Sequence, residues 1–175
     1  MNKLEILQNM GFKITWKLIY IGLNGLHEIP ILLTREEILD YVDGLLTDFN
    51  EQTDNIILLI CERDNPIMLN KIIKKLAENE ESNTMLQIRK WRAYLLKTLM
   101  DNISKDCLQG LLELMEFWMS MGKPKDCPHI FPNSQENNLE EYFTPFTYDF
   151  LVNKNHDWLN QEIQKIIESE KFDVK

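Results

Sequence analysis

The sequence predicts an all-α protein, and three observations support this fold class. Apolar residues recur at spacings of three and four along almost the whole chain of 175 residues, as in amphipathic helices. No convincing strand is present, and the predicted helices are joined by short connections. A chain of this length fits one ordinary domain. We therefore expect a single domain over residues 1–175 with about seven helices, arranged as an antiparallel bundle or a short solenoid-like stack of helix pairs.

The first two predicted helices have clear end signals. One covers residues 15–23 and stops at Asn24-Gly25. The next begins after Thr34, which forms a capping box with Glu37, because each side chain satisfies a backbone N–H that otherwise lacks a partner. Its apolar face is predicted to contain Ile38, Tyr41, Val42, Leu45, Leu46 and Phe49, while Glu36, Glu37, Asp40 and Asp43 fall largely on the other faces.

The middle of the chain predicts a pair of helices. The apolar run over residues 56–61 suits a helix or a strand, but no second strand is available to pair with it. We therefore predict a helix over residues 54–62. Asn65-Pro66 has the pattern of an N-cap followed by the first helical residue, so the second helix covers residues 67–78.

Three longer helices are predicted in the second half of the chain. A helix over residues 82–102 has an apolar stripe of Ile88, Trp91, Leu95 and Leu99, flanked by Arg89, Lys90, Arg92 and Lys97. A helix over residues 105–121 is expected to bury Leu108, Leu111, Leu112, Met115, Trp118 and Met119, with Gly122 as its C-cap. After a loop over residues 122–138, a last helix from about residue 147 to residue 171 is expected to bury Leu151, Trp158, Leu159, Ile163, Ile166 and Ile167.

Composition excludes several classes of protein. With 44% hydrophobic and 27% charged residues, the chain is not disordered. Its longest apolar run is too short to span a bilayer, and its first twenty residues contain no secretory signal. Three cysteines fit reduced thiols better than a disulfide framework. We therefore expect a cytoplasmic protein that does not bind membranes.

Charge is strongly acidic overall and uneven along the chain. The net charge is −9 and the pI is about 4.9, which disfavours nucleic-acid binding. Residues 27–64 hold ten acidic and two basic residues, whereas residues 71–105 hold eight basic and four acidic residues. The acidic segments are either solvated helix faces or a docking surface for a basic partner. The basic segment lacks the interleaved exposed aromatic residues of a single-strand binder.

Motifs for catalysis are almost absent. No phosphate-binding Gly-rich loop, H-E-x-x-H or C-x-x-C motif occurs, so no cofactor or metal is expected. The local cluster is Cys127 and His129, in which an adjacent imidazolium would lower the pKa of the thiol. This cluster is either a nucleophile or metal ligand, or an ordinary loop packed by Pro128. Trp16, Trp91, Trp118 and Trp158 are interpreted as core residues, with an aromatic ligand box as the alternative.

One basic and aromatic segment has two interpretations. In the first, Trp91 faces the core and Arg92 pairs with an acid on a neighbouring helix or extends to solvent. In the second, Arg89, Arg92 and Tyr94 line a groove that binds an anionic group. The first interpretation is favoured.

Several short segments resemble a bacterial family called domain of unknown function 2247. These segments are KWRAYL at 90–95, GLLEL at 110–114, FW at 117–118, PKDCPHI at 124–130, ITWKLIY at 14–20 and NHDWL at 155–159. The family has no established activity. Similar proteins occur among the small immunity proteins that accompany bacterial polymorphic toxins. The resemblance therefore implies a binding protein and brings no catalytic residues with it.

Three functions follow from these observations. The first is a non-enzymatic immunity protein that occludes a basic, nuclease-like toxin domain through Glu36, Glu37, Asp40 and Asp43, with aromatic anchors supplying affinity. The second is a small hydrolase or transferase that uses Cys127 and His129. The third is a scaffolding protein whose acidic faces only confer solubility.

Overall fold

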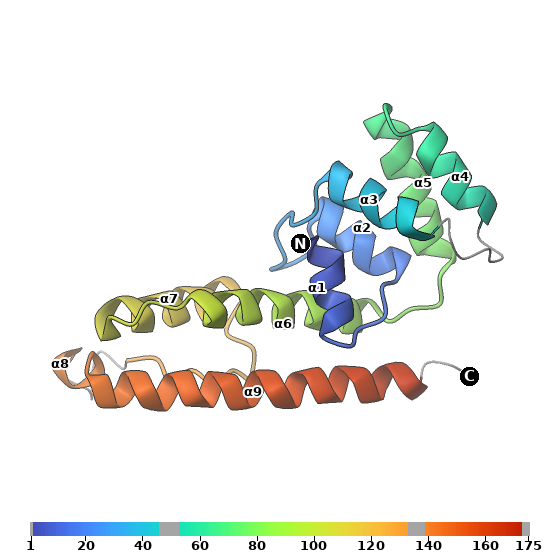
Figure 1. The fold of residues 1–175 in the computed structure, drawn as a ribbon. Coiled ribbons are helices and arrows are strands. Elements are labelled where there is room, and N and C mark those ends of the chain that lie inside the picture. The colour runs from blue at the N-terminus through green and yellow to red at the C-terminus, as the bar shows by residue number, and fades with distance from the viewer. Residues whose placement is uncertain (1, 46–52, 133–138, 173–175) are drawn as a thin grey trace. The chain divides into compact units, whose positions relative to one another are not determined.

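The chain is all-α in a computed structural model that describes residues 2–45, 53–132 and 139–172 (Figure 1). Within these ranges nine helices form, and extended pairing is limited to one bridge between Leu26 and Ile29. The helices are α1 (Lys3–Asn9), α2 (Trp16–Asn24), α3 (Arg35–Leu45), α4 (Thr53–Cys61), α5 (Pro66–Asn79), α6 (Thr84–Asn102), α7 (Cys107–Ser120), α8 (Leu139–Tyr142) and α9 (Pro145–Phe172).

All seven predicted helices are present, with ends shifted by a few residues. The predicted caps explain this agreement. The Thr34 hydroxyl accepts a hydrogen bond from the Glu37 N–H, and the Glu37 carboxylate accepts one from the Thr34 N–H. Asn65 caps α5 through the Met68 N–H, and Pro66 opens that helix. The ambiguous apolar run forms helix α4, so the choice of helix over strand is confirmed.

The two additional helices, α1 and α8, are short. Helix α1 had a local signal that the prediction overlooked, because Asn2 and Glu5 form a capping box at its start. Two residues of the apolar face predicted for α3, Leu46 and Phe49, lie outside the described residues.

The chain divides into two compact units, and each is described by itself. Unit 1 contains Met1–Trp91 and Ile166–Lys175, and unit 2 contains Arg92–Lys165. The boundaries fall inside α6 and α9. A single domain over residues 1–175 stays a prediction.

Unit 1 is organised around close packing of short helices. Helix α2 packs along α5, and α3 packs against both α1 and α4. The buried indole of Trp91 donates a hydrogen bond to the Leu18 carbonyl over 2.9 Å. Gly22 permits this approach, because a Cβ atom there would lie 2.5 Å from the Trp91 ring and 2.8 Å from Leu33.

Unit 2 is held by contacts between α7 and α9. The indole N–H of Trp118 donates to the side-chain oxygen of Asn155 over 2.6 Å, and the Trp118 and Trp158 rings meet edge to face. Near the start of α7, the Tyr148 hydroxyl donates to the Ser104 carbonyl. The core prediction for the tryptophans is confirmed for Trp16, Trp91 and Trp118, while Trp158 is half-buried.

The prediction of burial is wrong for two residues of α7. Leu108 and Met119 are exposed, whereas Leu111, Leu114 and Trp118 are fully buried. Leu108 and Met119 are eleven residues apart, which is about three turns, so they share one helix face. This apolar face lies next to the buried face, and periodicity alone does not show which part of a wide apolar stripe is covered.

Candidate functional site

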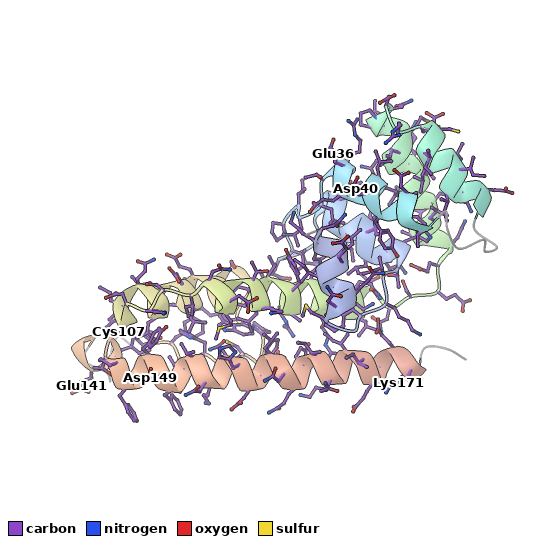
Figure 2. The ribbon with its side chains drawn as sticks, in the orientation of Figure 1. Glu36, Asp40, Cys107, Glu141, Asp149 and Lys171 are labelled. Carbon is purple, nitrogen blue, oxygen red and sulfur yellow. The ribbon has the colours of Figure 1, made fainter. Side chains whose placement is uncertain are left out.

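The outer face of α3 carries a stripe of exposed carboxylates. Glu36, Asp40 and Asp43 are all exposed, and their spacings of four and three place them on one side of the helix, away from the buried Ile38 and Val42. Figure 2 labels Glu36 and Asp40 on this helix. Hydrogen bonds from its own backbone N–H and from the Thr34 hydroxyl lower the pKa of Glu36, so this carboxylate is charged at neutral pH.

Glu37 does not belong to this exposed stripe, which corrects the expectation that it points outward. Its side chain is 19% exposed and forms an ion pair with Lys3, whose Nζ lies 2.8 Å from the carboxylate. Burial by itself raises the pKa of Glu37, but the hydrogen bonds from Lys3 and from the Thr34 N–H outweigh it and lower the pKa. Glu37 therefore joins α3 to α1 and caps α3.

Exposed apolar side chains lie on the helix next to the stripe. Ile57 and Leu58 of α4 are 47% and 44% exposed, while Ile56 and Leu59 of the same helix are buried. Because α4 packs against α3, carboxylates and apolar side chains are combined on neighbouring helices of unit 1. We call Glu36, Asp40, Asp43, Ile57 and Leu58 the α3–α4 surface.

The predicted anion-binding groove is not assembled by its residues. Tyr94 is buried, and the Arg92 guanidinium lies 3.4 Å from Glu162 and 3.2 Å from Asp126. The same guanidinium stacks over the Trp158 ring at 5.0 Å. Arg92 therefore pairs with an acid on α9, as the favoured interpretation of this segment expects. Arg89 is half-buried one turn earlier on α6, in unit 1.

Cys127 and His129 lie close in the chain but do not form a catalytic pair. The Cys127 thiol lies 3.8 Å from the backbone carbonyl of His129, and burial raises the pKa of the thiol. The His129 Nε2 lies 2.9 Å from the Tyr142 hydroxyl, and its Nδ1 has no hydrogen-bond partner among the described residues. Burial lowers the pKa of His129 to about 4, so the ring is neutral at pH 7. The thiol therefore contacts the His129 backbone and the ring contacts Tyr142, so no hydrogen bond in the described part of the chain joins the thiol to the ring that would have to accept its proton.

A cavity of about 260 Å³ adjoins Tyr142 in unit 2. Its lining includes Ile130, Glu141, Phe150 and Leu151, and neither Cys127 nor His129 lines it. A small hydrolase or transferase would require the thiol and the imidazole ring at the mouth of a cavity, and this cavity has neither group in its lining.

A buried ion pair in unit 1 was not predicted. Lys90 was predicted to flank the apolar stripe of its helix, but it is 0% exposed and forms an ion pair with the buried Glu170. Its ammonium also donates to the Lys13 carbonyl over 2.8 Å and to the Gln87 side chain over 2.9 Å. Burial lowers the pKa of Lys90, against the opposing effect of Glu170. All three N–H groups of the ammonium have partners, so Lys90 is structural.

A sequence signal for this pair existed on the last helix. Asn155, Glu162, Ile166 and Glu170 follow one another at spacings of seven, four and four, in register with the buried Leu151 and Leu159. A polar residue in register with an apolar stripe indicates a buried, partnered group.

None of the helices in the described part of the chain has the length and apolar character to cross a membrane.

The family model for an uncharacterized protein conserved in bacteria (DUF2247) matches residues 4–163. Comparison with curated proteins and with solved structures gives no match. The matched segment includes α1 through most of α9, and therefore both units. On this match, the chain belongs to the bacterial family of domain of unknown function 2247.

Proposed function

We propose that the protein is a non-enzymatic binding module that acts as immunity proteins do, by occluding a basic toxin domain. The observation that carries this proposal is the α3–α4 surface: α3 presents three exposed carboxylates on one face, and α4, which packs against α3, presents two exposed aliphatic side chains. Protein interfaces combine an apolar centre with charged groups around it, and carboxylates suit a partner whose cleft binds phosphate.

Charge and apolar area have separate roles in this proposal. The carboxylates of Glu36, Asp40 and Asp43 steer the basic partner and accept its Lys or Arg side chains. The exposed Ile57 and Leu58 supply the desolvated contact. Aliphatic anchors replace the aromatic ones that the sequence predicted, because three of the four tryptophans are buried in the core. The encounter rate should therefore fall with salt, as expected for exposed charges.

The resemblance to immunity proteins adds to this proposal, and the family match itself carries no activity. A hydrolase or transferase that uses Cys127 receives no support from the geometry of its thiol and of the His129 ring. A scaffolding protein remains the outcome if the α3–α4 surface binds nothing.

The test is a capture experiment with a matched charge control. The tagged protein is used as bait in a lysate of its host at low salt, and captured proteins are identified by mass spectrometry. The test variant is Glu36→Lys/Asp40→Lys/Asp43→Lys. The control is Glu116→Lys/Asp149→Lys/Asp157→Lys, which reverses three exposed carboxylates of unit 2 and so changes the net charge equally.

We expect one stoichiometric partner that arrests growth when it is expressed alone. Co-expression with the parent protein or with the control should restore growth, while the test variant should bind at least about 100-fold more weakly and fail to restore it. A partner that binds the test variant as tightly as the parent would refute the role of the α3–α4 surface. A partner without toxicity would refute the immunity function.

A further inference from the structure

A basic groove, opposite in charge to the α3–α4 surface, lies in unit 1 where α2 packs along α5. Two cavities adjoin there, of about 450 Å³ and about 260 Å³, and both are lined by Tyr20 and Lys74. The larger cavity is also lined by Ile67, Asn70 and Lys71. The smaller one extends the groove past Leu26 and the buried Ile21 and Ala77, and Lys17 and Glu78 also line it. We call this feature the α2–α5 groove.

The groove carries two ammonium groups that are available to a ligand. Lys71 and Lys74 are exposed, and Lys71 has no ion-pair partner within the described ranges. Lys74 lies 3.8 Å from Glu78, but both side chains are more than half exposed, so this pair is weak. Lys17 is different, because its ammonium donates to the carbonyls of Ser82 and Glu80. Glu78 also lines the smaller cavity, so three lysines and one carboxylate line the groove, which is locally basic in a protein with a net charge of −9.

The polar wall of the groove offers a hydrogen-bond donor. The Asn70 side chain donates to Asn24 over 2.8 Å and accepts a hydrogen bond from it over 3.4 Å. Asn24 also donates to the Tyr20 carbonyl, so the Asn24 amide is held in place. An Asn side chain has two N–H groups, and the second N–H of Asn70 remains for a backbone carbonyl.

The apolar part of the groove is exposed where it begins. Ile67 is 68% exposed, although it stands in the first turn of α5. From Ile67 to Ala77 the helix rises by about 15 Å, the length of about four to five extended peptide residues. The groove therefore matches a short peptide segment in length, and it offers such a segment both apolar and charged contacts.

We propose that the α2–α5 groove binds an acidic peptide segment of a partner protein. Carboxylates of the segment pair with Lys71 and Lys74, a backbone carbonyl accepts the Asn70 N–H, and an apolar side chain packs on the exposed Ile67. Charge complementarity selects this occupant, because Lys17, Lys71 and Lys74 outnumber Glu78 in the lining and acidic residues beyond a Debye length of about 8 Å are screened.

A nucleic acid fits the groove less well. A repeated phosphate backbone would meet the net charge of −9 along its whole length. Tyr20 is the aromatic side chain in the lining of both cavities, so no platform for successive bases is formed there. This site goes beyond the proposed function, because it lies on other helices than the α3–α4 surface and selects the opposite charge.

The experiment is a display selection of random twelve-residue peptides against the full chain, followed by fluorescence anisotropy of the enriched peptides. We expect enriched peptides to combine Asp or Glu with an apolar residue. Lys71→Glu/Lys74→Glu should weaken their binding at least about 30-fold, since two charge pairs become repulsive. Ile67→Ser should weaken binding about 5-fold without affecting the fold, because this side chain is mostly exposed.

The matched control is Lys75→Glu/Lys105→Glu, which changes the net charge equally at exposed lysines outside the groove lining. This control should bind the peptides within about 2-fold of the parent. Equal binding to both double variants, or failure to enrich any acidic peptide, would overturn the proposal. Enrichment of basic peptides would also overturn it and would favour the α3–α4 surface. A single-stranded oligonucleotide that binds more tightly than the peptides and loses binding in Lys71→Glu/Lys74→Glu would assign the groove to nucleic acid instead.

Discussion

Acid conditions should destabilise the protein through one buried histidine. His129 is 5% exposed, its Nε2 lies 2.9 Å from the Tyr142 hydroxyl, and its Nδ1 has no hydrogen-bond partner in the described part of the chain. A protonated ring at this position would place an additional charge and an unpaired N–H in an apolar environment. Burial accordingly lowers the pKa of His129 from 6.5 to about 4.

The sign and size of the effect follow from proton linkage. The unfolded chain binds a proton at His129 near pH 6.5, whereas the folded protein binds it near pH 4. Stability from the neutral ring is therefore fully present above pH 6.5 and is lost as pH falls toward 4. At pH 4.5 the loss amounts to about 2.5 kcal/mol, which is a large share of the stability of an ordinary domain.

The measurement is urea unfolding of the parent and of His129→Gln at pH 7.0 and at pH 4.5, followed by circular dichroism. The difference in unfolding free energy between the two pH values should be about 2.5 kcal/mol larger for the parent, because the variant lacks the titrating ring. His156→Gln replaces an exposed histidine of α9 and should behave as the parent does. If His129→Gln lost as much stability as the parent on acidification, within about 0.5 kcal/mol, the reasoning about the buried ring would be refuted.

Two further predictions concern the buried ion pair and the thiol. Lys90→Met should lower the unfolding free energy, measured with urea, by about 3–5 kcal/mol, because it leaves Glu170 buried without its charge partner. Lys90→Met/Glu170→Leu should lower it by clearly less than the sum of the two single changes, and additive losses would contradict the coupling. In variants that retain one cysteine each, Cys127 should react more slowly with iodoacetamide at pH 7.5 than the exposed Cys61, because burial raises the pKa of the Cys127 thiol. An equal or faster rate at Cys127 would restore it as a candidate nucleophile.

Local interactions allowed the sequence to predict most helices of this protein. The capping pairs act between residues three apart, as in Thr34 with Glu37 and Asn65 with Met68, so no distant part of the chain is needed. The buried positions of α3, including Ile38 and Val42, likewise follow from apolar spacing. The all-α class and the exposed acids of α3 were therefore determined by the sequence itself.

Other features depend on which helix faces are covered. Glu37 was expected to be exposed, but Lys3 is brought next to it from a position 34 residues earlier. Leu108 and Met119 were expected to be buried, yet the tertiary packing covers the adjoining face of α7. Periodicity identifies the apolar side of a helix, but it does not determine how wide a stripe the neighbours cover.

The candidate sites also combine features that follow from local sequence with features that depend on helix packing. The sequence determined that Glu36, Asp40 and Asp43 share one helix face, because that is a property of helical spacing. Tertiary packing is needed to bring α4 with its exposed aliphatic side chains against α3, to form a basic groove from α2 and α5, and to pair Lys90 with Glu170 across 80 positions of sequence. Burial, pKa shifts and charge pairing arise from contacts between distant segments, so they are fixed by the packing of helices rather than by the order of residues within one helix.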